Sequence, residues 1–192
     1  MQHFYNTVQK HISEAHLLKN GFNPIKVCEI GVHTAGHTKL LLQNYPNIEL
    51  VGIDPALSPQ TQQLLTEYPN FSFHHDYSLK VLPDYTDFDV VLIDGDHNYY
   101  TVYNELECIR RTHEKWPLVI LHDTHYPYGW QDFAYFPNTI PDGELNVPGR
   151  SGVRQAVEDW LKNNSTEDTR YKVTFYMVFP GLAVIEWYGD SI

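Results

Sequence analysis

Two carboxylic acids and a histidine lie within four positions of each other in this sequence, at Asp94, Asp96 and His97. They follow Val90–Ile93, a run of four apolar residues that is typical of a strand buried on both faces of a parallel sheet. In open α/β sheets ligands bind beyond the carboxyl ends of the strands, so these side chains are expected at a site. Acidic residues also cap helix N-termini, but that alternative explains one acid more easily than all three groups.

Other predicted strands end in the same way. Ile48–Ile53 is followed by Asp54, and Phe71–His74 is followed after one residue by Asp76. Leu118–Leu121 is followed by His122 and Asp123. Because the carboxyl ends of parallel strands meet at one edge of a sheet, we expect these groups to gather there.

The first predicted strand, Ile25–Ile30, runs into a glycine-bearing turn that begins at Gly31 and leads to an apolar helix. A strand, a turn of this kind and a helix make a nucleotide-binding unit, in which the helix N-terminus offers free N–H donors. The spacing is not that of a dinucleotide fingerprint, because His33 occupies the place of the second glycine. Asp54 stands where a carboxylate would hold the two hydroxyl groups of a ribose.

The whole pattern predicts a doubly wound, Rossmann-like α/β fold. Five strand–helix units are followed by two apolar runs, 171–179 and 182–188, around the turn Pro180-Gly181. We therefore expect a mostly parallel seven-stranded sheet that ends in an antiparallel hairpin, preceded by a helix over 2–19. No linker or internal repeat interrupts residues 1–192, which predicts a single domain.

Residues 126–151 break the alternation of strands and helices. The segment is rich in aromatic residues: Tyr126, Tyr128, Trp130, Phe133, Tyr135 and Phe136. Long loops inside compact domains are usually lids or binding loops, and so many rings argue against disorder. Packing of the rings over a sheet edge explains the composition equally well, so both interpretations stay open.

Composition limits the classes of molecule that the protein is expected to bind. A formal charge of −11 over 192 residues argues against a nucleic-acid partner. The sequence opens without a secretory signal and contains no run of membrane-spanning length, so we expect a cytoplasmic protein without a membrane partner. Cys28 and Cys108 fall in a predicted strand and helix and are expected to be reduced. The oligomeric state stays open, a homo-oligomer included.

These features together resemble the class I S-adenosylmethionine-dependent methyltransferases, over nearly the whole chain. The terminal hairpin fits that family's sheet, and Glu29-Ile30-Gly31 looks like its first motif. The resemblance implies that Gly31 approaches the methionine part of the cofactor and that Asp54 binds the ribose. It also implies that Asp76 faces the adenine amino group, with Glu29 acting nearby, often through water.

Within that class, Asp94-Gly95-Asp96-His97 and His122-Asp123 look most like the small-molecule branch that includes macrocin-type sugar O-methyltransferases. The resemblance implies a divalent metal on Asp94 and Asp123, magnesium first and manganese or another ion as the alternative. His97 is implied as the general base. His122 stands where an acid is usual, so it is a further candidate ligand that puts the metal's identity in question.

The chemistry of these residues fits transfer of a methyl group to the hydroxyl of a sugar, polyol or natural product. Such a hydroxyl is a poor nucleophile at neutral pH, and the ordinary histidine pKa of about 6.5 suits a base that removes its proton. Three alternatives remain: a nicotinamide-dependent oxidoreductase, a non-haem iron oxygenase that uses His122 and His125, and a catalytically silent cofactor-binding domain.

Overall fold

The structure is a computed structural model of the 192-residue chain and describes residues 2–18, 24–133, 150–166, 171–177 and 179–188. Seven strands form one mixed sheet in the order β3-β2-β1-β4-β5-β7-β6. The strands are β1 Ile25–Ile30, β2 Ile48–Ile53, β3 Phe71–His74, β4 Val90–Ile93, β5 Leu118–His122, β6 Tyr171–Tyr176 and β7 Leu182–Trp187. The predicted fold class is confirmed, including the antiparallel hairpin that places β7 between β5 and β6.

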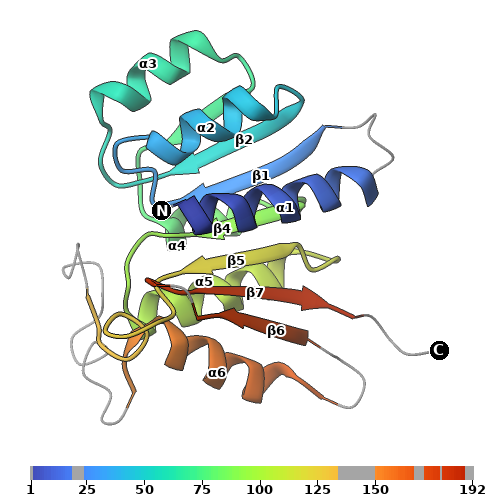
Figure 1. The fold of residues 1–192 in the computed structure, drawn as a ribbon, viewed down its shortest axis with the longest axis vertical. Helices are drawn as coiled ribbons and strands as arrows, with labels where there is room; N and C mark the ends of the chain where they lie inside the picture. Colours follow the sequence, from blue (N-terminus) through green and yellow to red (C-terminus); the bar gives the residue numbers. More distant parts are fainter. Residues whose placement is uncertain (1, 19–23, 134–149, 167–170, 178, 189–192) are drawn as a thin grey trace.

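Helices cover both faces of this sheet (Figure 1). They are α1 Gln2–Leu18, α2 Gly36–Asn44, α3 Pro59–Glu67, α4 Ser78–Val81, α5 Tyr99–Thr112 and α6 Gly152–Asn164, with a 3₁₀ turn at Leu82–Asp84. The predicted helix over 2–19 is present as α1, one residue shorter. Ser58 begins α3 by accepting a hydrogen bond from the Thr61 amide, as its position before Pro59 indicates.

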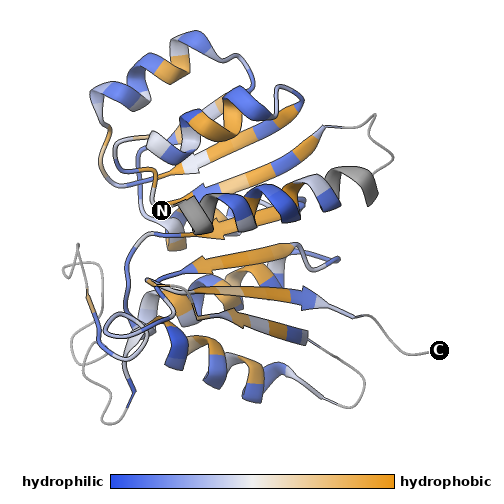
Figure 2. Ribbon diagram, viewed as in Figure 1, coloured by the Kyte–Doolittle hydropathy of each residue, from blue (hydrophilic) through white to orange (hydrophobic). Residues whose placement is uncertain are grey.

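Two hydrophobic cores form because successive strand residues face opposite sides of the sheet. In β4, Val90 and Leu92 pack into the core beneath α1, α2 and α3, whereas Val91 and Ile93 pack into the core beneath α5 and α6. Figure 2 shows the strands largely in the hydrophobic colour and the helices with hydrophilic outer surfaces. The continuous apolar run in β4 is thus the mark of a strand buried on both faces.

Parallel pairing aligns the carboxyl ends of the first five strands. β4 lies between β1 and β5 and is parallel to both, with Ile93 opposite Ile30 and Leu121. Gly31 directly follows β1 and has a φ of 90°, and a Cβ at this position would overlap the backbone of Asp94. Glycine is therefore required here by the close approach of the two strand ends, before any ligand is considered.

Between β3 and β4, the sequence-based prediction missed α4 and the 3₁₀ turn after it. Four helical residues are too few to display a 3.6-residue period, so no pattern could have identified α4. The short helix nevertheless matters, since it begins at the sheet edge where the site lies. Within the described part of the chain, no helix is both long enough and apolar enough to span a membrane. Cys28 and Cys108 are free thiols, the first buried and the second half-buried.

Candidate functional site

A cavity of about 960 Å³ runs along the carboxyl edge of the sheet. Its lining comes from the ends of β1, β2, β4 and β5, the segments that follow the five parallel strands, and residues of α4 and α5. The lining residues are Ile30, Gly31, His33, Ile53, Asp54, Pro55, Ala56, Tyr77, Ser78, Leu79, Lys80, Asp94, Gly95, Asp96, His97, Thr101, His122 and Asp123. Of the predicted site residues, the cavity brings together Gly31, Asp54, Asp94, His97, His122 and Asp123.

Asp54 lies in this wall directly after β2, almost fully buried at 7% exposure. Its Oδ2 accepts a hydrogen bond of 2.7 Å from the His33 amide, and its Oδ1 accepts one of 2.7 Å from the Ala56 amide. His33 has a φ of 49°, a left-handed conformation that non-glycine residues adopt at a cost. The turn after β1 is therefore bent onto Asp54, and two backbone donors fix the orientation of its carboxylate.

Glu29, the other acid of the first motif, does not reach the cavity wall. Its side chain is buried within β1, where Oε2 accepts a hydrogen bond of 2.6 Å from the Thr38 hydroxyl. Nδ1 of His37 lies 2.6 Å from Oε1. Glu29 thus anchors the first turn of α2.

Asp76 also stands apart from the cavity lining. It accepts a hydrogen bond of 2.8 Å from the Tyr77 amide and forms an ion pair of 3.2 Å with Lys80. These two donors hold the pKa of the Asp76 carboxyl below its usual range. The next residues, Tyr77, Ser78 and Lys80, line the cavity instead, because the chain turns into α4 at this point.

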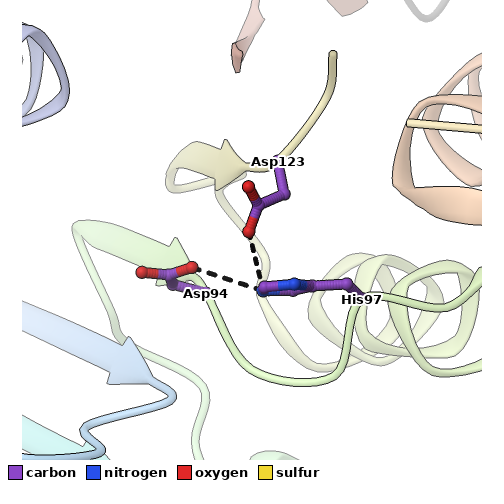
Figure 3. A group of neighbouring side chains, drawn as sticks. All are labelled: Asp94, His97 and Asp123. Carbon is purple, nitrogen blue, oxygen red and sulfur yellow. Dashed lines mark ion pairs between the residues drawn. The ribbon is translucent and has the colours of Figure 1, made fainter. Parts of the chain in front are cut away.

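Four titratable side chains meet where β4 and β5 end. Nε2 of His97 lies 3.0 Å from Oδ2 of Asp123 and 3.4 Å from Oδ1 of Asp94 (Figure 3). Nδ1 of His122 lies 2.9 Å from the same oxygen of Asp94 and 3.0 Å from the same oxygen of Asp123. Each carboxylate thus faces two imidazoles, and each imidazole faces two carboxylates.

Opposite charges at short range raise the pKa values of the two histidines and lower those of the two aspartates. Burial lowers the pKa of His97, but its hydrogen bonds to Asp123 and Asp94 outweigh burial and raise it to about 9. The same balance raises the pKa of His122 to about 9. Burial raises the pKa of Asp123, but the two histidines overcome it and lower that pKa to about 2. Without a cation the cluster therefore holds two imidazolium ions and two carboxylates at neutral pH.

The backbone of Asp123 is also strained, with a φ of 59°. Aspartate tolerates this left-handed conformation better than most residues, yet it still costs about 1 kcal/mol or more. The conformation places Asp123 within reach of both His97 and His122, with only 4% of the residue exposed. Such strain is concentrated at functional sites.

Of the aromatic segment, the structure describes residues 126–133 and 150–151, and two of these residues, Tyr128 and Phe133, contact His97. The Tyr128 ring meets the His97 ring edge-on with a centroid distance of 5.8 Å. The Phe133 amide donates a 2.8 Å hydrogen bond to the His97 carbonyl. Asp132, which the sequence-based prediction missed, accepts hydrogen bonds from the amides of Tyr99 and Gly152, at the first residues of α5 and α6. Tyr135 and Phe136 lie outside the described residues.

Comparisons with known proteins identify the family and the fold of the chain. A family model described as a methyltransferase domain matches residues 28–124, from β1 to the residue after Asp123. An uncharacterised protein of Acanthamoeba polyphaga mimivirus is 26% identical over 145 residues. That match covers 66% of this chain and 63% of the viral protein, so the chain spans less than two thirds of this relative.

Two solved structures show the same fold. A candidate caffeoyl-CoA O-methyltransferase from Staphylococcus aureus has a TM-score of 0.63 at 14% identity, covering 96% of this chain and 82% of the other. A Podospora anserina methyltransferase with bound S-adenosylhomocysteine has a TM-score of 0.58 at 18% identity, covering 86% and 72%. With half of the sequence matched by the family model, the chain belongs to the class I S-adenosylmethionine-dependent methyltransferases.

Proposed function

We propose that this protein transfers a methyl group from S-adenosylmethionine to a hydroxyl oxygen of a small molecule, with the help of a divalent cation. The observation that carries the proposal is one continuous cavity that joins Gly31 and Asp54 to Asp94, His97 and Asp123. A sulfonium methyl has a good leaving group, so the enzyme's main task is to bring the acceptor oxygen in line at about 3–3.5 Å. A cavity shared by cofactor and acceptor supplies that placement.

The cofactor would lie along the strand ends in the order of the sheet. Asp54 would accept hydrogen bonds from the ribose, because its carboxylate lines the cavity and is already oriented by two amides. Gly31 would face the methionine part at the end of β1. Glu29 would act from behind the cavity wall, by anchoring the first turn of α2 through His37 and Thr38. Asp76 would lie near the adenine, with its carboxylate engaged by Lys80.

The residues at the ends of β4 and β5 fit a divalent cation. One ligand atom each from Asp94, His97 and Asp123 lies within 4.8 Å of the others, and His122 approaches the same two carboxylate oxygens. Either imidazole could therefore complete the set, and we assign His122 to the cation and His97 to the acceptor proton. A cation held there would orient the acceptor oxygens and stabilise a developing alkoxide. Carboxylates suit magnesium, whereas an imidazole in the set favours manganese, nickel or zinc, which should therefore compete well.

His97 is proposed as the group that removes the acceptor proton. Its pKa of about 9 reflects the two facing carboxylates, so on its own the chain would hold His97 as a cation at pH 7. Compensation of the charge on Asp94 and Asp123 would remove the cause of this shift. His97 would then be neutral in its working state, with Nε2 able to accept a proton.

The acceptor is proposed to be a small hydroxyl-bearing molecule such as a sugar, polyol or natural product. The Tyr128 ring beside His97 would form one wall of its pocket. The net charge of −11 gives no reason to expect nucleic acid.

The experiment compares two matched variants, His97→Asn and His122→Asn. Calorimetry should give unchanged S-adenosylhomocysteine affinity in both, because neither side chain lies at the ends of β1–β3. Manganese affinity, followed by electron paramagnetic resonance, should fall in His122→Asn and hold in His97→Asn, which should instead lose turnover. The reverse pattern of manganese binding would make His97 the ligand and remove it as the base. Full activity in a chelator would overturn the role of the cation, and no binding of S-adenosylhomocysteine would overturn the proposal itself.

A further inference from the structure

Asp132 joins the segment after β5 to the N-termini of two helices. It is half-buried, and its Oδ1 accepts hydrogen bonds of 2.7 Å from the Tyr99 amide and 2.6 Å from the Gly152 amide. Tyr99 is the first residue of α5, and Gly152 is the first residue of α6. A carboxylate is favoured at both places, because the first amides of a helix lack acceptors within it and carry the positive end of its dipole.

The backbone of the same segment supplies the other acceptors at the start of α6. The carbonyl groups of Tyr128 and Gly129 accept hydrogen bonds from the second, third and fourth amides of the helix, at 3.2, 3.1 and 3.4 Å. Ser151, the residue before α6, makes no side-chain cap of its own. Residues 128–132 therefore satisfy all four amides that the helix leaves free, so this stretch is held by hydrogen bonds and not by ring packing alone.

Residues 132 and 133 also hold the chain at His97 and just beyond it. The Phe133 amide donates a hydrogen bond of 2.8 Å to the His97 carbonyl, and the two residues form an antiparallel bridge. Two positions after His97, the Tyr99 amide donates to Asp132. Between them, Asn98 is fully buried and accepts a hydrogen bond of 2.8 Å from an amide in the first turn of α5. The backbone of His97 is thus attached to the segment at two points.

The imidazole of His97 is held differently from its backbone. Its Nε2 faces Asp123 at 3.0 Å and Asp94 at 3.4 Å. A cation on these carboxylates would compete for the same oxygens and weaken their hold on the ring. The position of the ring would then depend more strongly on where the backbone of His97 is held, and therefore on Asp132.

We propose that Asp132 is a positioning residue for His97. By joining residues 128–133 to the first residues of α5 and α6, it sets the place of the His97 imidazole beside the acceptor. Asp132 is not among the residues that line the cavity, so it acts through the backbone and touches no ligand. This inference rests on the proposed role of His97 as the base, and it gives residues 128–133 a part in the reaction as the support of that base.

Loosening of α5 against α6 is the competing explanation for any effect of Asp132, and Asp159 provides the matched control. Asp159 also joins the two helices, since its Oδ2 accepts a hydrogen bond of 3.1 Å from the Tyr99 hydroxyl. The same oxygen lies 3.5 Å from Nε of Arg150. Both contacts are made by side chains, so neither holds the backbone beside His97.

The test follows the contact between the His97 and Tyr128 rings, which meet edge-on in the unaltered protein. The nuclear Overhauser effect between their ring protons reports this contact, in protein labelled at histidine and tyrosine, with and without magnesium. Asp132→Ala should lose the effect in the presence of magnesium, because one of the two attachments of the His97 backbone is gone. Asp132→Asn keeps an acceptor oxygen and should retain the effect, and Asp159→Ala should retain it as well.

A further variant decides the matter if circular dichroism shows that Asp132→Ala does not fold. Asp132→Glu keeps the charge at both helix ends but moves the oxygen by one methylene group, so it should also lose the ring contact. A contact retained in these variants under both conditions, or lost equally in Asp159→Ala, would overturn the inference. Absence of S-adenosylhomocysteine binding, or full turnover in His97→Asn, would instead overturn the proposed function and leave the ring contact unchanged, so the two failures are distinguishable.

Discussion

The two halves of the cavity hold their acidic side chains by different means. At the ends of β1–β3, the carboxylates of Asp54 and Asp76 accept from backbone amides, and Glu29 is held by residues of α2. At the ends of β4 and β5, Asp94 and Asp123 are held only by two imidazoles among the contacts described above. Amide donors keep their protons at every physiological pH, whereas imidazolium protons can leave.

We call the part of the site at the ends of β1–β3 the fixed half. The part at the ends of β4 and β5 is the exchangeable half, because the protons on its imidazoles can be replaced by a cation. Two imidazolium ions and two carboxylates carry no net charge, and neither do two neutral imidazoles, two carboxylates and one divalent cation. A cation can therefore replace two protons with little change in the total charge of the site. Asp54 offers no such exchange, because both of its donors are backbone amides.

The largest effect should come from removing one carboxylate of the exchangeable half. Asp123→Asn removes a ligand and leaves His97 and His122 without one of their two partners. Turnover should fall at least about 100-fold, since even changes outside the ligand shell of metal sites cost 10- to 100-fold. S-adenosylhomocysteine affinity should stay within about twofold. The control is Asp87→Asn, whose carboxylate pairs with Lys26 on the surface. Loss of cofactor binding in Asp123→Asn would show that the halves are not separate.

The second effect concerns pH and follows from the raised pKa values of His97 and His122. Cation affinity should rise between pH 6 and pH 9, by up to about 100-fold per pH unit where two protons are released. Calorimetry in buffers of different ionisation enthalpy counts those protons directly. Cofactor affinity should change little over the same range, and a flat cation affinity would contradict the charge exchange.

Stability of the cation-free chain should respond to the same groups. The pKa of each histidine is raised from 6.5 to about 9, so its stabilisation is fully present below pH 6.5 and is lost as pH rises through 9. The pKa of Asp123 is lowered to about 2, so its contribution is present above its ordinary pKa and is lost as pH falls through 2. Thermal unfolding between pH 6 and pH 10, with and without manganese, measures the difference.

The sequence was informative wherever a local pattern determines the structure. Segments of four to six residues rich in apolar side chains identified β1 to β5, and parallel pairing then brought Asp94 and Asp123 together without further information. The direction of a side chain beyond a strand end was not predictable. Asp76 turns to Lys80 because α4 begins two residues later, and no periodicity revealed α4.

Side-chain contacts between distant segments were equally beyond the sequence. The ordinary pKa of histidine suggested a base for neutral pH, but two carboxylates within 3.4 Å raise the pKa of His97 to about 9. Glu105 carries no signal in the sequence, and only the fold shows that it is buried against Ser78. Such effects depend on the tertiary neighbours of a group, which spacing along the chain does not specify.

A third change should act on the fixed half alone. Asp54→Ala removes the acceptor for the ribose and also releases the amides of His33 and Ala56. Hydrogen bonds to charged groups contribute about 1.5–3 kcal/mol, so S-adenosylhomocysteine affinity should fall roughly 10- to 100-fold. Manganese affinity should be unchanged, which electron paramagnetic resonance can check. An unaltered cofactor affinity would remove Asp54 from the cofactor site.

The smallest effect should come from a substitution in the aromatic segment. This substitution tests whether the segment contributes to the acceptor pocket or only packs over the sheet edge. Tyr128→Leu removes a ring that meets His97 edge-on, an interaction worth about 0.5–1.5 kcal/mol. Turnover of the acceptor should fall roughly 2- to 10-fold, while cofactor affinity stays the same. Tyr126→Leu is the matched control, since Tyr126 is 62% exposed and should tolerate the change. If both variants reduce thermal stability equally and leave turnover intact, the rings only pack over the sheet edge. If Tyr128→Leu alone lowers turnover, the segment forms part of the acceptor pocket. The reason is that the Tyr128 ring contacts His97, the proposed base, and contacts no residue named in the fixed half.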